Sequence, residues 1–336
     1  MGKESFIGGD YIETTGGSSK TYAGKNIENS SLGNQFTQNG LDSGVTYGTN
    51  ESAPNLKQED KKCFCEKEFE EKDIKSFYNS KRLFTAKNCP LPAEMKTYQA
   101  FTDALNKAMK DNNINTCLRK AHFLAQIETE SDRLNTTMEY ASGWDYDHST
   151  HLEGYNKYKL YLDNKKRKDN PYLANNTKQL RRSYNRYKEC LSHGHTSKGD
   201  GPKYKGKGLI QLTWRDTYEK YFIHIEKPEL IDTPEVIANN LTYTCDSAGW
   251  FWDDRQLGNY ADKDDLIFIS VRINGGLNGF DHRKSNVKSI IKLMEIKENC
   301  ITNKLESIGT YKYETSNIKN LKWGKNNKSK IQKYDD

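Results

Sequence analysis

The sequence has few apolar residues for its length and contains no long hydrophobic run. Its 336 residues are 34% hydrophobic, and the mean hydropathy is −0.98. The longest apolar runs, such as residues 266–271, are far shorter than the roughly 20 residues that a transmembrane helix needs. We therefore expect no membrane span, and we expect a good part of the chain to lie outside any core.

Two further sequence features are absent. Residues 1–10 lack the continuous apolar stretch of a secretory signal peptide. We therefore expect synthesis in the cytoplasm without general secretory export, so that a role outside the cytoplasm needs another route. No repeat of 20 to 50 residues is visible, which excludes a repeat architecture.

The cysteines do not form a paired pattern. Seven of them occur at irregular spacings, and an odd number excludes a complete set of disulfides within one chain. Cys63-Phe64-Cys65 and the run from Cys190 to His195 suggest zinc, but neither has the C-x2-C spacing that makes such a motif specific. We expect reduced thiols, no metal and no cofactor.

The net charge of +6, from 52 basic and 46 acidic side chains, is too small for a histone-like protein, and we expect no nucleic-acid partner. The basic residues are concentrated, however, because residues 154–208 hold 15 Lys or Arg against 4 Asp or Glu. This stretch is either a solvated insertion or a surface that binds an anionic polymer.

Composition divides the chain into three parts. The first 50 residues hold 10 of the 24 glycines and 17 Ser, Thr or Asn, which is typical of a floppy leader or of a small β-rich module. We assign residues 1–60 to this N-terminal module and its linker. Residues 61–310 form the main domain, with a basic insertion at 147–203, and residues 311–336 form a polar basic tail.

Apolar periodicity in the main domain predicts a mainly α fold. We expect helices at 98–112, 115–129, 232–240, 243–255, 263–271 and 283–297, and a strand-like run at 208–213. Asn115 or Thr116 can cap the second helix. Trp250, Phe251 and Trp252 are expected to pack in the core.

Four segments place polar groups beside apolar ones, at 121–131, 138–143, 199–213 and 273–279. In this order they resemble the lysozyme-like family 19 glycoside hydrolases, which include chitinases and bacterial or phage endolysins. The resemblance covers residues 119–293 apart from the insertion. It implies a mainly α, lysozyme-like α+β catalytic domain.

Inverting hydrolysis of a glycosidic bond needs a carboxylic acid that protonates the leaving oxygen and a carboxylate that activates water. Glu130 closes a helix whose other face is apolar, and such a surrounding would keep it protonated as the general acid. Glu139 follows in a polar loop and is our general base. The rivals are Glu128, which points about 200° around the helix from Glu130, and Asp147, which borders the insertion.

The resemblance also implies roles for polar residues in the later segments. Thr213 would hold the attacking water with Glu139, and Gln211 would bind sugar. Asn274 precedes two glycines and offers an amide to an N-acetyl group or a hydroxyl. The remaining substrate-binding candidates are Tyr204 and Lys207, of which Lys207 stands where the family usually carries arginine.

These features favour a hydrolase of peptidoglycan glycan strands over a chitinase, because the chain lacks an aromatic-rich, cysteine-dense chitin-binding module. Without a signal peptide, we expect delivery as an antibacterial effector of a contractile, type VI-like injection apparatus. Residues 1–60 would contact its spike or tube, the enzyme would act in the target periplasm or cell wall, and an immunity protein would protect the producer. The alternatives are a phage-type endolysin and, in another class, a non-catalytic glycan-binding module.

Overall fold

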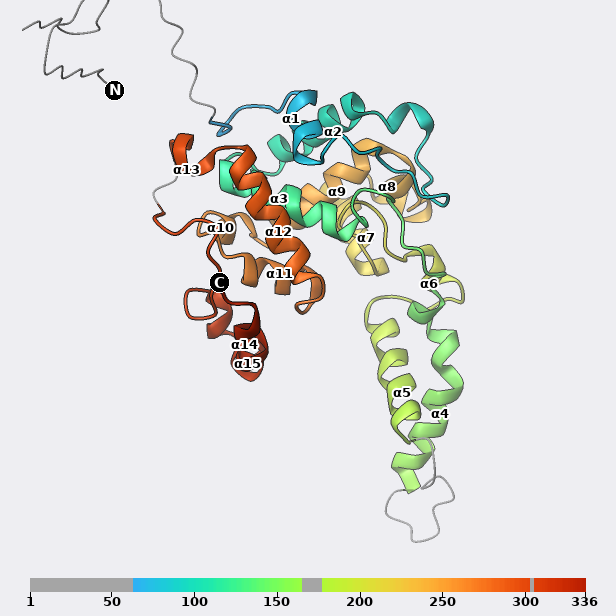
Figure 1. Cartoon of the computed structure of the whole chain (residues 1–336). Helices are drawn as coiled ribbons and strands as arrows, with labels where there is room; N and C mark the ends of the chain where they lie inside the picture. Colours follow the sequence, from blue (N-terminus) through green and yellow to red (C-terminus); the bar gives the residue numbers. More distant parts are fainter. Residues whose placement is uncertain (1–62, 165–176, 303–304) are drawn as a thin grey trace, which may run out of the picture. The chain divides into compact units, whose positions relative to one another are not determined.

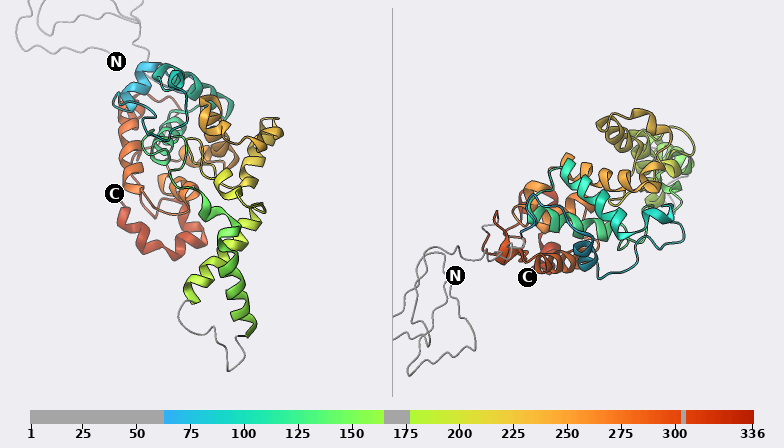
Figure 2. Two further views of the ribbon diagram at one scale, coloured as in Figure 1. Left: turned by 90° about the vertical axis from the view of Figure 1, so that its right-hand side faces the viewer. Right: turned by 90° about the horizontal axis from the view of Figure 1, so that it is seen from above.

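The computed structural model describes residues 63–164, 177–302 and 305–336, and these are mainly α-helical (Figure 1; Figure 2). The longer helices are α1 (Glu71–Phe77), α2 (Tyr98–Asp111), α3 (Cys117–Glu130), α4 (His148–Asn164), α5 (Thr177–Ser192), α7 (Arg215–His224), α9 (Leu241–Asp254), α11 (Leu266–Asn274) and α12 (Phe280–Leu293). The shorter ones are α6 (Asp200–Lys203), α8 (Val236–Asn239), α10 (Gly258–Ala261), α13 (Ile296–Asn299), α14 (Lys322–Asn326) and α15 (Lys328–Ile331). Single 3-10 turns lie at Ala93–Met95, Trp144–Tyr146, Pro228–Asp232, Asn317–Asn320 and Gln332–Tyr334.

The predicted mainly α class is confirmed. In the described ranges, β structure is limited to two isolated bridges, which pair Met138 with Lys207 and Lys207 with Leu212. The β-rich module expected within residues 1–60 lies outside the described residues. No helix in the described part of the chain is long and apolar enough to cross a bilayer.

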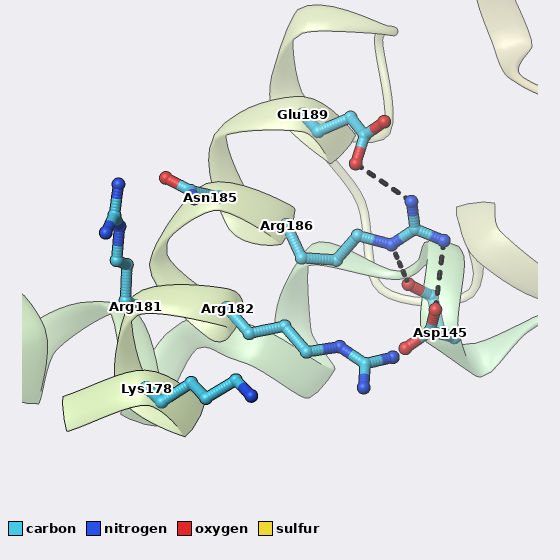
Figure 3. Close-up of a pocket in the computed structure, with 7 residues that line it drawn as sticks. All are labelled: Asp145, Lys178, Arg181, Arg182, Asn185, Arg186 and Glu189. Atoms are coloured by element: carbon cyan, nitrogen blue, oxygen red, sulfur yellow. Dashed lines mark hydrogen bonds and ion pairs between the residues drawn. The ribbon is translucent and has the colours of Figure 1, made fainter. Parts of the chain in front are cut away.

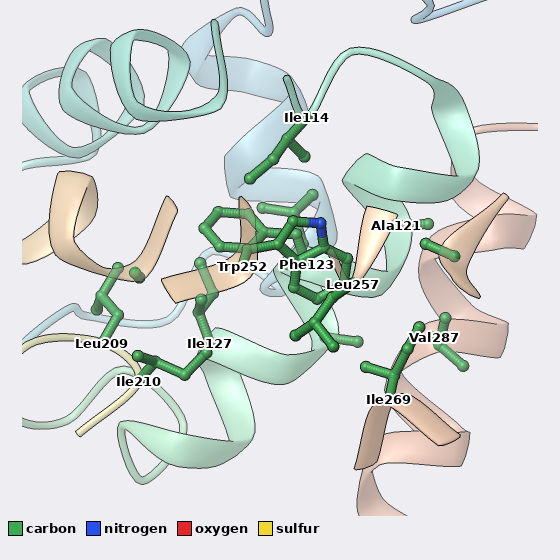
Figure 4. Packing of buried hydrophobic residues seen from close by; sticks show 14 of the residues in the cluster. Ile114, Ala121, Phe123, Ile127, Leu209, Ile210, Trp252, Leu257, Ile269 and Val287 are labelled. Atoms are coloured by element: carbon green, nitrogen blue, oxygen red, sulfur yellow. The ribbon is translucent and has the colours of Figure 1, made fainter. Parts of the chain in front are cut away.

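Helix α3 runs through the middle of the core. Thr116 caps its start, where the side-chain oxygen accepts a hydrogen bond from the Arg119 N–H at 3.2 Å. Most of the helix is buried, and Phe123 packs edge-on against Trp252 of α9 with ring centroids 5.5 Å apart (Figure 4). Each large apolar side chain buried here stabilises the fold by about 1.5–3 kcal/mol. The prediction that residues 250–252 are core residues is confirmed, since all three are buried.

The expected helices at 98–112, 115–129, 243–255, 263–271 and 283–297 correspond to α2, α3, α9, α11 and α12, with ends shifted by a few residues. The prediction at 232–240 is only partly right. Pro234 lies inside that range and cannot donate a helical hydrogen bond. The segment therefore forms the 3-10 turn Pro228–Asp232 and the single-turn helix α8.

The prediction of a strand at 208–213 is wrong. The chain turns back on itself here, because the Lys207 N–H donates to the Leu212 carbonyl at 3.0 Å and the Leu212 N–H donates back at 2.8 Å. Gln211 adopts a left-handed backbone with φ of +55°. Leu209 and Ile210 point into the core, so the apolar residues that suggested a strand instead anchor a tight turn. We call residues 206–213 the active-site turn.

The insertion folds as a pair of helices, α4 and α5, which lie side by side and which we call the α4–α5 arm (Figure 1; Figure 2). Within the described parts of the two helices, only His151 and Cys190 are buried. Tyrosines join the pair instead, since Tyr155 stacks on Tyr184 and Tyr187 at centroid distances of 5.1 and 4.2 Å. The connection at 165–176, which holds several of the basic residues, lies outside the described residues.

The C-terminal segment packs on the core through two carboxylates, the buried Asp264 and the more exposed Asp336. Asp264 accepts hydrogen bonds from the Gly309 N–H at 2.6 Å and the Tyr311 hydroxyl at 3.2 Å, and it contacts buried His122 at 2.7 Å. At the other end of the segment, Asp336 contacts lysines of α12. The segment expected as a tail is therefore tied to α11 and α12.

We predict that Asp336→Asn lowers stability at neutral pH. Burial alone would raise the pKa of Asp336, but hydrogen bonds from Lys288, the Tyr311 N–H and Lys284 outweigh it and lower the pKa to about 2. A pKa below the unfolded-state value gives stabilisation that is complete above that value and is lost as the pH falls through the folded-state pKa. The free energy of unfolding at pH 7 should fall by about 1–2 kcal/mol.

Denaturant unfolding between pH 7 and pH 2 measures this effect. The difference between wild type and Asp336→Asn should shrink as the pH falls from about 4 to about 2. Asp232→Asn is the control, because that side chain is 86% exposed and its ion pair is long, at 3.8 Å. Equal stability of Asp336→Asn and Asp232→Asn at pH 7 would contradict the prediction.

Candidate active site

A cavity of about 440 Å³ opens where the C-terminal end of α3 meets the active-site turn. Each lining residue carries a polar group, and three of them are carboxylates. The lining residues are Thr129, Glu130, Asp132, Thr136, Glu139, Tyr140, Tyr146, Gln211 and Thr213. The structure thus brings together four residues selected from the sequence, namely Glu130, Glu139, Gln211 and Thr213.

Glu130 is the last residue of α3 and is held by a buried arginine. Arg283 of α12 forms an ion pair with Oε1 of Glu130 and donates a second hydrogen bond to the Gln126 side chain. Arg283 is 1% exposed and Gln126 is fully buried, so the guanidinium is fixed. The prediction that Glu130 has an apolar surrounding is therefore wrong. Within the described residues no hydrogen bond engages Oε2, so this oxygen is free to contact a molecule in the cavity.

Glu139 lies in the loop after α3, and both of its carboxylate oxygens accept hydrogen bonds. The Gly206 N–H donates to Oε2 at 3.0 Å, and the Tyr146 hydroxyl donates to Oε1 at 3.1 Å. The Glu139 N–H donates to the Gly206 carbonyl at 2.9 Å, which fixes the loop to the turn. These contacts fix the orientation of the Glu139 carboxyl group.

Gly206 is needed for this arrangement because the backbone passes close to two site side chains. A Cβ atom at this position would lie 2.8 Å from Oε1 of Gln211 and 3.2 Å from Oε2 of Glu139. At Gly206 the backbone therefore approaches Glu139 and Gln211 too closely for a larger residue.

Tyr146 connects Glu139 to the α4–α5 arm. Its burial, together with the negative charge of Glu139, raises the pKa of the hydroxyl to about 12, so Tyr146 remains a hydrogen-bond donor at neutral pH. Its ring packs edge-on against Trp214 at 5.1 Å, and the Arg186 guanidinium of α5 lies 5.1 Å from the same ring. The orientation of Glu139 therefore depends on Tyr146 and on the end of the α4–α5 arm that packs against it.

Gln211 and Thr213 reach the cavity from the active-site turn. The Gln211 amide donates to the Gly208 carbonyl at 2.9 Å, and the Thr213 hydroxyl donates to the Gln211 carbonyl at 3.0 Å. Both side chains line the cavity because the chain turns here, and not because it forms the expected strand.

Three predicted substrate-binding residues do not line this cavity. Tyr204 is 1% exposed and its hydroxyl donates to the Ile231 carbonyl at 3.2 Å. Lys207 is 2% exposed, its burial lowers the pKa to about 8, and its ammonium group lies over the Tyr218 ring at 5.3 Å. The prediction that Tyr204 and Lys207 contact sugar directly is therefore wrong, and both side chains pack against Tyr218 instead. Asn274 is exposed at the end of α11, away from the cavity lining.

The two alternative carboxylates, Glu128 and Asp147, make their hydrogen bonds and ion pairs outside the cavity. Glu128 pairs with Lys81 at 2.9 Å and accepts a hydrogen bond from Asn286, and it does not line the cavity. Asp147 is fully buried. Burial would raise its pKa, but hydrogen bonds from Ser149 and from the Gly199 and Gly201 N–H groups outweigh this and lower it. Asp147, which directly precedes α4, therefore connects the start of that helix to α6.

Sequence reasoning missed several lining or supporting groups. Arg283 comes from a helix 153 positions after Glu130, and no local pattern signals the pairing. Asp132 and Tyr140 share a hydrogen bond of 2.8 Å at one side of the cavity. Tyr146 stands next to Asp147, the residue that the sequence suggested as a base.

A second, basic cavity of about 490 Å³ lies on the arm (Figure 3). It is lined by Asp145, Lys178, Arg181, Arg182, Asn185, Arg186 and Glu189. Arg186 is neutralised by Asp145 at 2.9 Å and Glu189 at 2.8 Å. Lys178, Arg181 and Arg182 are exposed, and no ion pair is found for them within the described ranges. The arm therefore presents three positive charges near the residues that position Tyr146.

Comparison with known proteins adds an independent observation. Over 97 residues, the chain is 37% identical to a glycosyl hydrolase family 19 domain-containing protein of Haemophilus influenzae, a match that spans 29% of this chain and 46% of that protein. Over 65 residues it is 37% identical to acidic endochitinase Q of Nicotiana tabacum, spanning 19% and 25%. The chain carries a segment similar to family 19 glycoside hydrolases. It spans less than half the length of these curated relatives.

Solved structures give weaker matches. Chitinase C from Streptomyces griseus aligns with a TM-score of 0.42 and 13% identity over 70% of this chain and 79% of that chain. A bacterial family 19 chitinase aligns with a TM-score of 0.39 and 16% identity over 70% and 98%. No family model matches the chain.

Proposed function

We propose that the chain is a glycoside hydrolase that cleaves β-1,4 bonds of the peptidoglycan glycan strand with inversion. The observation that carries this proposal is the shared cavity of Glu130 and Glu139, two glutamates in different local environments. One ends a helix beside a buried arginine, and the other is held in a loop by two hydrogen bonds. Two positioned carboxyl groups are what glycosidic hydrolysis requires.

In this mechanism Glu130 protonates the leaving glycosidic oxygen through Oε2, since Oε1 is held by Arg283. Water attacks the anomeric carbon as the bond to the leaving oxygen breaks, and its proton passes to Glu139. The Gly206 N–H and the Tyr146 hydroxyl orient Glu139 throughout. Thr213 holds the water, and Gln211 binds the sugar beside it.

The anionic character of peptidoglycan supports this substrate over chitin. A neutral chitin chain has no use for the exposed charges of Lys178, Arg181 and Arg182, whereas an anionic wall polymer is attracted by them. Chitin is the second candidate, and the names of the relatives favour it, since they include an endochitinase. Both substrates contain β-1,4-linked N-acetylated sugars, so the same two glutamates serve either reaction.

Digestion of purified substrates by the full-length chain separates the two candidates. We expect soluble fragments with new reducing ends from purified sacculi, identified by mass spectrometry, and a much slower release from chitin oligosaccharides. Faster cleavage of chitin would assign the enzyme to chitin. The mass of the reducing-end sugar also distinguishes a muramidase from a glucosaminidase.

We predict that neutralising the arm weakens binding to the wall. Replacing Lys178, Arg181 and Arg182 together with glutamine should reduce sedimentation with intact sacculi at low salt, and the difference should fade above about 0.15 M salt, where screening acts over roughly 8 Å. Hydrolysis of short neutral glycans should not change. The matched control is the triple change of exposed lysines on the C-terminal segment, Lys322, Lys325 and Lys330, to glutamine. Equal sacculus binding by both triple variants would show that the arm is a solvated insertion with no part in wall binding.

Delivery as an injected antibacterial effector is part of the proposal and rests on the sequence of residues 1–60. We predict that deleting these residues leaves hydrolysis of purified sacculi nearly unchanged, because every residue of the candidate site lies beyond residue 125. Killing of target cells by a donor strain should be lost. Equal killing by truncated and full-length forms would remove the loading role and favour an endolysin released by lysis of its host cell.

A further inference from the structure

Four cysteines from distant parts of the sequence converge beside the start of α3. Cys63 and Cys65 lie in the segment that leads into the domain, Cys117 is the first residue of α3, and Cys300 follows α13. Their sulfur atoms all lie within 4.8 Å of one another. The irregular spacing in the sequence hid this group, because one short C-x-C motif meets two single cysteines only after folding.

Three of the six sulfur–sulfur distances match the edge length of a tetrahedron around a metal ion. The Cys63–Cys117, Cys65–Cys117 and Cys65–Cys300 sulfur distances are 3.8, 3.6 and 3.7 Å. Tetrahedral coordination with metal–sulfur bonds of about 2.3 Å places the sulfurs about 3.8 Å apart. A disulfide would need a separation of about 2.05 Å. The geometry therefore fits four ligands of one small ion and does not fit two disulfides.

The surroundings of the sulfur atoms suit thiolates. Cys63, Cys65 and Cys117 are buried. Backbone N–H groups point at two of the sulfurs, from Phe64 to Cys117 at 3.3 Å and from Cys117 to Cys65 at 3.4 Å. Such hydrogen bonds stabilise negative charge on sulfur.

A buried cation lies next to this group. Lys120, one turn after Cys117, is 4% exposed, and its ammonium group donates to the Phe64 carbonyl at 2.8 Å and to the Lys67 carbonyl. A lysine is almost never buried unless its charge is compensated. A zinc ion bound by four thiolates carries a net charge of −2, which gives this ammonium group a partner.

We propose that Cys63, Cys65, Cys117 and Cys300 bind one zinc ion in a closed structural site. The expectation of no metal, which rested on the missing C-x2-C spacing, is replaced by this proposal. Zinc binding displaces one proton from each of the four thiols, and no oxidant or reductant is needed. Four protein ligands leave no open position for substrate, so the ion has no part in hydrolysis.

The position of the site explains what the ion would do. It would join the segment that enters the domain to the start of α3, since Cys117 comes 52 positions after Cys65, and to the end of α13, since Cys300 comes 235 positions after Cys65. Closing such long loops constrains the unfolded chain strongly. Because Cys117 begins the helix that Glu130 ends, the ion would fix one end of the helix that carries the proposed acid.

Elemental analysis of the full-length chain, purified without chelator, tests the proposal. We expect one zinc per chain in the wild type and less than a tenth of that in Cys63→Ser/Cys65→Ser. The matched control is Cys89→Ser/Cys190→Ser, which changes two buried cysteines outside the group and should keep its zinc. Removing zinc with a chelator should lower the Tm of the wild type by about 10 °C or more.

Cobalt substitution keeps the test decisive if the cysteine variant fails to fold. Refolding the wild type with Co²⁺ should give the intense visible and near-ultraviolet bands of a tetrahedral thiolate complex, and added Zn²⁺ should remove them. Metal-free protein with no cobalt bands would overturn the proposal. So would stoichiometric iron in place of zinc, or an intact mass showing that the four thiols have lost hydrogen to form disulfides.

Discussion

Replacing Glu130 by glutamine is expected to reduce hydrolysis of purified peptidoglycan by on the order of 10²- to 10⁴-fold. The amide keeps the shape of the side chain, and its oxygen can still accept the hydrogen bond from Arg283. It cannot donate a proton to the leaving glycosidic oxygen. Release of reducing ends from sacculi measures the effect, and the thermal melting curve reports whether the variant is folded.

Glu128→Gln is the matched control for the acid. The two glutamates lie two positions apart on α3, but Glu128 contacts Lys81 and Asn286 outside the cavity. We expect this variant to lose stability through its weakened ion pair and to keep its activity per folded molecule within a few fold. Residual activity above a tenth of wild type in Glu130→Gln, or inactivation by Glu128→Gln alone, would assign the role of general acid to Glu128 instead.

The second large effect is expected for the base. Glu139→Gln should also lower activity by on the order of 10²- to 10⁴-fold, because an amide cannot take the proton from the attacking water. Its oxygen can still accept one hydrogen bond from the Gly206 N–H or the Tyr146 hydroxyl, so the loop should keep its conformation. Substrate affinity should change little. Comparison of kcat with KM on a soluble glycan measures the two effects separately.

Asp147→Asn is the control for the base, since this carboxylate is buried away from the cavity. It accepts hydrogen bonds from Ser149, Gly199 and Gly201, and the amide cannot accept them all. We expect a lower Tm with activity per folded molecule largely retained. An active Glu139→Gln together with a folded but inactive Asp147→Asn would show that the base assignment is wrong.

The helices with one clear apolar face could be predicted from the sequence. Both α3 and α9 bury side chains at helical spacing, so periodicity alone located them within a few residues. The α4–α5 arm was not predicted in this way. Its α5 helix does carry a tyrosine-rich face at helical spacing, which packs on α4, but the remaining residues are so polar that the segment was interpreted as a solvated insertion.

The candidate site was predictable where one local segment supplies both the position and the chemistry. Glu130 and Glu139 stood out through their motifs, and the fold places both in one cavity. Tyr204 and Lys207 looked equally well placed in the sequence, but the active-site turn buries them. Arg283 was missed because its pairing depends on how α12 packs against α3, which no local pattern encodes.

The sequence shows only the Cys63-Phe64-Cys65 part of the cysteine group, for the same reason. The distance between Cys65 and Cys300 in the sequence is 235 positions, and the meeting of their sulfurs depends on the fold of the whole domain. Spacing rules for metal sites detect ligands supplied by one or two short loops. Ligands supplied singly by a helix start and a helix end escape such rules.

The most direct test of the proposed chemistry is the anomeric configuration of the first product. A time course of ¹H NMR spectra, recorded while the full-length chain digests a soluble β-1,4-linked peptidoglycan fragment, follows the new reducing ends before they mutarotate. Inverting hydrolysis with Glu130 as acid and Glu139 as base predicts that the α-anomer appears first. A β-anomer that appears first, or tight binding of the fragment without any new reducing end, would contradict it.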